Sequence, residues 1–404
     1  MVVRTSKVDT GGGGWSALLT LLAVQVIASM ATMTLPVAAP LVALSFGFPV
    51  EAIGSFMAAM FSASIVATLS AGSLVTRHGV VRVSQGALLL CALGLVLCTL
   101  PYRTALAIGA VLIGLGYGPI TPASSHLLAR TTPARRVAIV FSLKQTGVPL
   151  GGMLAGVLLP TLVLAAGWQV AFLAVAAVCL FCAFIAESLR KRLDADRYST
   201  QPLRFHSFVQ PLKLVLAHAR LRKLAMVSFM FCSIQLSLTT YLVAYFNGPL
   251  GYTLVQAGLV LAVVQAGGVA GRVLWGHTAD AWVRPQRLLA ALGVLIALGS
   301  LAMATLPPSV ALSSACVLLA LFGACAIGWN GVYLAEIARE AAPGTASMAT
   351  AGALVFTYMG MVVGPATFAL ILRLSDSYRL GFATLAIPAI VGSLLILLSC
   401  ARKA

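Results

Sequence analysis

Two basic side chains, Lys144 and Arg272, border long stretches of this 404-residue sequence that carry no other charge. If these stretches cross a bilayer, a Lys or Arg near its centre costs about 2.5–3.5 kcal/mol on insertion scales, so such residues usually face a cavity and serve a function. A guanidinium can hold a carboxylate through two parallel hydrogen bonds, whereas an ammonium acts as a point charge. The chemistry predicted from these two residues is the binding of an anion.

No acidic residue is expected at a comparable depth. The acids of the apolar stretches map near their ends and are Glu51, Glu187, Asp280, Glu336 and Glu340. We therefore expect the ligand to supply the negative charge. Two other roles stay open for Arg272, which lies about two helical turns from Asp280: a tie between helices, or a side chain that extends to the membrane surface. The second of these is also open for Lys144.

The composition indicates a membrane protein. Apolar residues make up 60% of the chain, charged residues 9%, and the mean hydropathy is +1.03, whereas a soluble domain carries roughly 25% charged residues. The net charge of +17 does not indicate nucleic-acid binding, because Lys and Arg cluster in short segments between apolar runs. The eight cysteines lie in apolar runs and indicate inert thiols rather than metal ligands or disulfides.

Three charge-free stretches, 145–186, 224–271 and 288–335, are each about twice the ~20 residues that one crossing needs. Gly, Asn or Pro residues interrupt each stretch near its middle, so each is predicted to form two crossings. The same interpretation of the whole chain predicts an all-α membrane protein. Its twelve transmembrane helices are expected at residues 15–44, 50–75, 83–101, 104–129, 137–166, 168–189, 221–246, 252–278, 286–306, 309–336, 346–372 and 378–400.

The basic residues test this count, because alternate loops must lie on opposite sides of the membrane. Of the 26 Lys and Arg residues, 21 fall on the side of both termini. They are Arg4, Lys7, Arg77, Arg82, Arg130, Arg135, Arg136, Arg190, Lys191, Arg192, Arg197, Arg204, Lys213, Arg220, Arg222, Lys223, Arg284, Arg287, Arg339, Arg402 and Lys403. Only Arg103, Arg373 and Arg379 fall on the other side. This asymmetry predicts that both termini are cytoplasmic.

The chain also divides into two halves. Residues 190–220 form a long polar segment that predicts a cytoplasmic linker between two six-helix bundles, 15–189 and 221–400, with cytoplasmic tails at 1–14 and 401–404. Glycine-rich patterns in the fourth and fifth predicted helices recur in the tenth and eleventh. Such internal duplication is common in secondary transporters, whose substrate site lies between the repeats.

The loop after the second predicted helix carries a resemblance to a known family. Its sequence Gly72-Ser-Leu-Val-Thr76-Arg77-His-Gly79 is similar to the signature of the Major Facilitator Superfamily, in which an acidic residue stands where this chain has Thr76. The related segment of the second half, Gly276-His-Thr-Ala-Asp280, keeps the acid. The resemblance implies a conformational latch formed by Gly72, Arg77, Gly79, Gly276 and Asp280; the alternative is that Arg77 and its neighbours are ordinary positive-inside loop residues.

A narrower resemblance is to monocarboxylate and related organic-anion porters. It rests on Gly271-Arg272-Val-Leu-Trp-Gly276, Thr146-Gly147-Val-Pro149 and Gly167-Trp168. In other family members the fourth helix carries an Arg that is associated with proton coupling. This chain has no Arg at the corresponding position near Gly114.

Polar residues within the predicted spans are candidates to line a substrate cavity with Arg272 and Lys144; their alternative role is hydrogen bonding between helices. They are Gln25, Tyr117, Thr121, Gln145, Gln235, Tyr241, Gln265, Asn330, Tyr333, Thr357 and Tyr358.

These observations predict a secondary transporter that moves a small organic anion, carboxylate-like, by alternating access, with a proton as the candidate coupling ion. The alternative is an exporter of neutral or amphipathic drugs or metabolites, and a non-transporting receptor on the same fold is a third hypothesis. No nucleotide-binding, metal-binding or nucleophile–base pattern occurs, so neither an enzyme nor a cofactor is expected. We expect a monomer in a bacterial inner membrane.

Overall fold

The computed structural model describes residues 13–131, 140, 143–194, 209–342 and 345–401. Every element in these ranges is a helix, and twelve helical stretches are long and apolar enough to cross a membrane. The predicted all-α fold with twelve spans is confirmed.

The first half contains α1 (Gly13–Phe46), the short helix η1 (Val50–Ala52), α2 (Ile53–His78), α3 (Val80–Cys98), α4 (Arg103–Tyr117), α5 (Ile120–Thr131), α7 (Gly147–Ala166) and α8 (Trp168–Leu193). After α9 (Val209–Ala217), the second half contains α10 (Ala219–Asn247), α11 (Leu254–Ala281), α12 (Pro285–Ala304), α13 (Leu312–Ala326), α14 (Asn330–Glu340), α15 (Ala346–Ser375), α16 (Tyr378–Thr384) and α17 (Ala386–Ala401).

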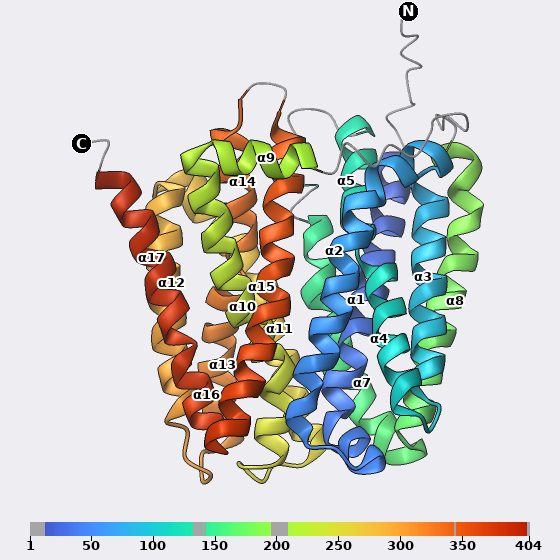
Figure 1. Cartoon of the computed structure of the whole chain (residues 1–404), viewed down its shortest axis with the longest axis vertical. Coiled ribbons are helices and arrows are strands. Elements are labelled where there is room, and N and C mark those ends of the chain that lie inside the picture. Colours follow the sequence, from blue (N-terminus) through green and yellow to red (C-terminus); the bar gives the residue numbers. More distant parts are fainter. Residues whose placement is uncertain (1–12, 132–139, 141–142, 195–208, 343–344, 402–404) are drawn as a thin grey trace, which may run out of the picture.

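The helices stand side by side, and α1 begins at the same end of the bundle at which α17 finishes (Figure 1). We call this end the termini end and the opposite one the far end. Large apolar side chains such as Phe184, Val273 and Leu374 are more than 65% exposed on the bundle surface. Because a water-soluble protein would not leave so much apolar surface uncovered, these side chains mark the face that lipid covers.

The described basic residues follow the predicted charge asymmetry. Arg77, Arg284 and Arg339 lie at the termini ends of their helices, whereas Arg103 and Arg379 lie at the far end, in the first turns of α4 and α16. Eight of the basic residues counted for the termini side lie outside the described residues, namely Arg4, Lys7, Arg135, Arg136, Arg197, Arg204, Arg402 and Lys403.

Four of the predicted spans were expected to be single unbroken helices, and this expectation is wrong: each of the four spans is interrupted. The span predicted at 104–129 breaks between α4 and α5, that at 309–336 between α13 and α14, and that at 378–400 between α16 and α17, and the helix predicted from residue 137 has a turn at Thr146. Proline explains three of these breaks, because its ring removes the N–H that would bond four residues back. Pro122, Pro149 and Pro388 stand just after the breaks, and glycine-rich sequence surrounds the fourth.

The predicted linker is also partly helical. Residues 190–193 continue α8, residues 195–208 lie outside the described residues, and α9 then crosses the termini end of the second half (Figure 1). The carbonyl of Pro211 in α9 lies against Gly352 of α15, where a Cβ atom would approach it to 2.2 Å. Glycine therefore allows the linker helix to pack directly on the second bundle.

The two halves meet at the far end. A Cβ atom on Gly54 of α2 would lie 2.7 Å from the carbonyl oxygen of Pro365 in α15, and one on Gly156 of α7 would lie 2.5 Å from that of Gly258 in α11. At the termini end, α5 packs mainly on α1, α2 and α3 of its own half, and α14 on α10, α11, α12 and α15 of its own half. The halves are thus sealed at the far end and separate toward the termini end.

The N-terminus of α3 is capped by a residue from α8's C-terminal end. The carboxylate of Asp194 accepts the backbone N–H groups of Val81 (2.9 Å) and Arg82 (3.1 Å). Gly79, immediately before α3, has φ +92°, and a Cβ atom there would lie 2.2 Å from the Asp194 carboxyl carbon. Gly79 thus has a local structural role besides any part in a latch.

We expect Gly79→Ala to lower the melting temperature of the purified protein by more than Asp194→Ala does. Loss of a cap costs about 0.5–2 kcal/mol, whereas Gly79→Ala displaces the cap and also places a side chain at positive φ. Gly72→Ala is the matched control, because a Cβ atom on Gly72 meets no atom within 4 Å. Equal melting temperatures for Gly79→Ala and the wild type would contradict this account of the cap.

Candidate functional site

Arg272 and Lys144 lie together, buried between the two halves, with exposed fractions of 6% and 1%. The Arg272 guanidinium donates a hydrogen bond to the main-chain carbonyl of Gln145 in the other half, and its Nε donates to the carbonyl of Ile327 at 3.4 Å. The Lys144 ammonium lies 3.5 Å from the side-chain oxygen of Gln145. All these acceptors are neutral, and no ion pair among the described residues involves either cation.

Broken helices provide the carbonyls that hold Arg272. In a regular helix the Gln145 carbonyl would accept the N–H of residue 149, but that residue is Pro149 and has no N–H. The Ile327 carbonyl lies in the break between α13 and α14. A related case occurs in the first half, where Pro122 leaves the Gly118 carbonyl free and Thr68 donates to it at 2.8 Å. Helix breaks near mid-membrane are the places where transporters build solute sites.

Aromatic rings from the second half form one wall of this region. Trp329 packs edge-on against Phe231 and Tyr333, with ring centroids 5.4 and 5.2 Å apart. Trp329 Nε1 and the Tyr333 hydroxyl are buried without a hydrogen-bond partner. A buried polar group without a partner costs about 1–3 kcal/mol, so these two groups are candidates to bind a ligand atom. In the first half, Phe61 packs edge-on against Tyr117, and it also stacks on Tyr358 of α15 in the second half.

Shorter polar contacts fill the rest of the region. Gln25 accepts a hydrogen bond from Thr121 at 3.1 Å, and Asn330 donates to Gln235 at 3.3 Å. Thr357 contacts the Ser228 hydroxyl at 3.2 Å.

The structure places two predicted site residues elsewhere on the interface. Tyr241 lies at the far-end contact, where its hydroxyl donates to the carbonyls of Pro365 (2.9 Å) and Glu51 (3.3 Å). Gln265 lies two turns from Arg272 toward the far end and faces Gly152 of α7. The predicted latch residues lie at the termini end, where Arg77 and Asp280 are exposed.

The sequence analysis did not identify Trp329 as a site residue, and it did not predict that the acid Glu336 is buried. Trp329 stands four residues before Tyr333, on the same helical face, and this spacing was the available signal. Glu336 is near a span end as expected, yet only 3% exposed. Its carboxylate accepts hydrogen bonds from Gln286 (2.8 Å) and Arg339 (3.2 Å) of its own half, so its charge is already compensated there.

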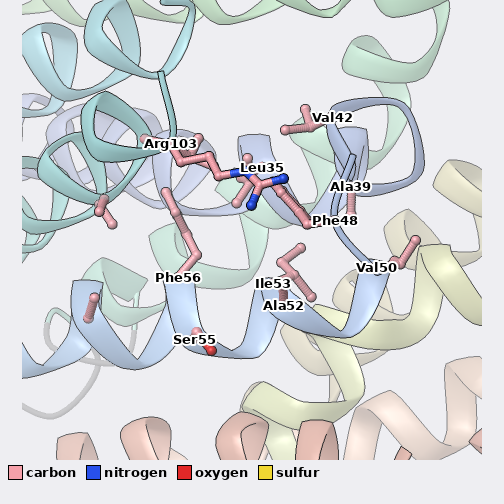
Figure 2. A pocket seen from close by; sticks show the side chains of 14 residues that line it. Leu35, Ala39, Val42, Phe48, Val50, Ala52, Ile53, Ser55, Phe56 and Arg103 are labelled. Atoms are coloured by element: carbon pink, nitrogen blue, oxygen red, sulfur yellow. The ribbon is translucent and has the colours of Figure 1, made fainter. Parts of the chain in front are cut away.

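A separate hollow of about 190 Å³ lies at the far end, between α1, α2 and α4. Figure 2 shows its apolar lining, with Phe56 and Ile53 below Arg103 and Val42 above it. Arg103 donates to the carbonyls of Phe46 (2.8 Å) and Gly47 (3.1 Å) and so holds the turn after α1. This hollow is formed by the first half alone and does not include Arg272 or Lys144.

Twelve spans in two halves, with broken helices around a buried pair of cations, define a membrane transporter. The profile of the Major Facilitator Superfamily matches residues 21–354, and the chain belongs to this family. The predicted family and the expectation of a transporter rather than an enzyme are confirmed.

Two relatives have names that refer to transport. The "Benzoate transport protein" of Acinetobacter baylyi is 27% identical over 335 residues, which cover 74% of this chain and 70% of the relative. A "Putative metabolite transport protein" of Haemophilus influenzae is 28% identical over 338 residues, 80% of each chain.

Solved structures show the same fold. A bacterial homologue of the human lysosomal transporter Spinster, in an inward-facing and occupied conformation, has a TM-score of 0.74 at 16% identity and covers 96% of this chain and 97% of its own. The peptide transporter POT in complex with sulfate also has a TM-score of 0.74 at 16% identity, covering 96% and 94%.

Proposed function

We propose that this protein is a secondary transporter for a small organic anion, a carboxylate carried on an aromatic or similarly compact apolar body. The observation that carries the proposal is the pair Arg272 and Lys144, buried between the halves with only neutral hydrogen-bond acceptors. Two charges so deeply buried are costly unless an anion joins them. The name of the Acinetobacter baylyi relative, which refers to benzoate, supports the same class of substrate.

The carboxylate is placed on Arg272 with Lys144 beside it. To form a two-pronged contact with the guanidinium it must compete with the Gln145 carbonyl, which belongs to the opposite half. Substrate binding therefore replaces a contact between the halves by a contact to the ligand. A ligand that changes such a contact has different affinities for the two conformations, which is the requirement for shifting their populations.

The aromatic wall suits the body of this substrate. An aromatic ring between Trp329 and the opposing Tyr117 and Phe61 gains stacking or edge-to-face contact. The unpartnered Trp329 N–H and Tyr333 hydroxyl supply hydrogen bonds for a ring substituent or for the second carboxylate oxygen.

A proton is the proposed coupling ion, and Lys144 is its proposed carrier. Arg272 stays charged at any physiological pH, whereas a buried lysine can lose its proton. When the anion leaves, the two neighbouring cations repel each other, and release of the Lys144 proton relieves that repulsion. Tyr117 and the Cys232 thiol are the other titratable groups within electrostatic range of Arg272, and no carboxylate of the described residues takes this role.

Both termini are proposed to be cytoplasmic, in a bacterial inner membrane, so that the conformation described here opens to the cytoplasm. In the opposite conformation the termini end must close. Gly72 of α2 and Gly276 of α11 have no atom within 4 Å of a Cβ position, and Asp280 is exposed. These free surfaces support a latch that forms only when the termini end closes; Thr76 leaves the first half without the acidic partner.

Uptake of labelled benzoate into proteoliposomes tests the proposal. We expect saturable uptake that an inward-directed proton gradient stimulates, and competition by other aromatic carboxylates but not by benzamide, the neutral analogue. Lys144→Gln should retain benzoate binding at reduced affinity and lose the stimulation by protons. Equal competition by benzamide would instead favour a carrier of neutral or amphipathic compounds.

A further inference from the structure

A second hollow, of about 1070 Å³, lies on the outer surface of the first half between α2, α3 and α4. Its wall is mainly apolar and includes Val66, Leu89 and Leu93, which are 64%, 51% and 50% exposed. Exposed leucine and valine on a membrane-spanning helix face lipid, so this groove opens to the acyl-chain region of the bilayer. It does not include any residue of the proposed substrate site.

Basic side chains line the end of the groove that lies at the termini end. Arg77 and His78 form the last turn of α2, and Arg82 lies in the first turn of α3. Arg77 is exposed and makes no ion pair with the described residues. The neighbouring Thr76 is uncharged, and its hydroxyl donates a hydrogen bond to the carbonyl of Gly72.

The acidic groups that the structure describes around this basic cluster are already engaged. Glu187 of α8 lies 3.5 Å from Arg82 but is shared with Arg190 at 2.5 Å. Asp194 accepts the two N–H groups that begin α3. Among the described side chains, two carboxylates thus stand against the three arginines Arg77, Arg82 and Arg190, with His78 next to Arg77 in the sequence, and the cluster keeps a net positive charge.

The length of the groove fits one acyl chain. Arg77 and Val66 are eleven residues apart on α2, which corresponds to about 16 Å of helix. The hydrocarbon core of a bilayer is about 30 Å thick, so one leaflet takes up about half of it. The groove therefore runs from the headgroup level at Arg77 to the middle of the membrane at Val66.

We propose that an anionic phospholipid of the leaflet at the termini end binds this groove. Its phosphate contacts Arg77 and Arg82, with His78 as an additional donor, and one acyl chain lies along Val66, Leu90 and Leu115. A basic cluster above an apolar groove matches an anionic headgroup on an acyl chain, and a soluble anion would leave the groove unfilled.

Thermal stability of the delipidated protein in detergent tests this site, with phosphatidylglycerol as the probe. We expect saturable stabilisation by phosphatidylglycerol and much less by phosphatidylcholine, because ligand binding to the folded state raises the melting temperature. Arg77→Gln should weaken the phosphatidylglycerol affinity about fivefold. Arg103→Gln, at the far end, is the matched control and should leave that affinity unchanged.

Gly86→Leu tests the groove itself. Gly86 lines the hollow, and a Cβ atom there meets no atom within 4 Å. The leucine should therefore fit without lowering the melting temperature of the delipidated protein, while it occupies the acyl-chain position and abolishes the stabilisation. Equal stabilisation by phosphatidylcholine, or by soluble glycerol phosphate, overturns the proposal, as does unchanged phosphatidylglycerol binding in both Arg77→Gln and Gly86→Leu.

Discussion

Replacement of Arg272 by glutamine is expected to lower benzoate uptake at subsaturating concentration by roughly 10- to 100-fold. A hydrogen bond to a charged partner is worth about 1.5–3 kcal/mol, and each 1.4 kcal/mol is a factor of ten. The glutamine amide nitrogen stands where Arg272 Nε donates to the Ile327 carbonyl, so that contact within the second half can be retained, while the charge and the shorter contact to the Gln145 carbonyl are removed. Arg272→Lys restores the charge without the two-pronged geometry and should fall between glutamine and the wild type.

Equilibrium binding of benzoate to the purified variants separates the two roles that Arg272 can have. If Arg272 holds the carboxylate, the loss appears in the dissociation constant. If it only ties helices together, the glutamine variant binds benzoate like the wild type. Arg103→Gln serves as the control for the loss of one positive charge, because Arg103 lies at the far end, in a hollow formed by the first half alone.

The span count and the charge asymmetry were predictable because lipid imposes them on the sequence. Each crossing needs about 20 apolar residues, and basic residues concentrate in the loops of one side. Hydropathy therefore located all twelve spans, including the paired crossings in 145–186 and 224–271. It also placed Lys144 and Arg272 inside the membrane region, where the structure shows them buried.

The helix breaks could not be located from hydropathy, because an apolar helix that is broken has the same composition as one that is continuous. The prolines held the missing information. Pro149 frees the Gln145 carbonyl four residues earlier, and that carbonyl accepts the Arg272 guanidinium. Which partner takes a freed carbonyl depends on contacts between the halves, and one sequence does not contain those.

The position of Asp194 illustrates the same limit. It stands in a polar segment that was predicted to be a linker, yet its carboxylate caps α3 more than a hundred residues earlier. Similarly, the Trp329 N–H is identified as an unpartnered group only when its surroundings are known. The sequence predicts which residues are buried better than it predicts which polar atoms remain unpaired.

Gly54→Leu is expected to hold the transporter open at the far end and to reduce uptake to background. In the conformation described here, a Cβ atom on Gly54 would lie 2.2 Å from the Tyr241 hydroxyl and 2.7 Å from the Pro365 carbonyl. Both neighbours belong to the opposite half, so a larger side chain pushes the halves apart. Overpacking of this kind costs about 1–3 kcal/mol, which shifts a two-state equilibrium about 5- to 150-fold toward the conformation that lacks the contact.

Labelling of a cysteine placed at the far-end contact measures this shift. Ala369, whose Cβ lies 3.0 Å from the Gly54 Cβ position, is replaced by cysteine and treated with a membrane-impermeant maleimide from the far side. Labelling should be slow in the Ala369→Cys protein and fast when Gly54→Leu is added; Gly54→Leu without the new cysteine corrects for native thiols.

Gly72→Leu provides the opposite case. Gly72 has open space at the termini end in this conformation, so the leucine is tolerated here and hinders only the closure of that end. With Ala369→Cys it should slow maleimide labelling below the reference and also reduce uptake. Leucine at either of two positions on α2 would then inhibit transport, but by favouring opposite conformations. Alternating access predicts this result, whereas a general destabilisation of α2 cannot produce it. Fast labelling in both variants, or in neither, would contradict the assignment of Gly54 and Gly72 to opposite gates.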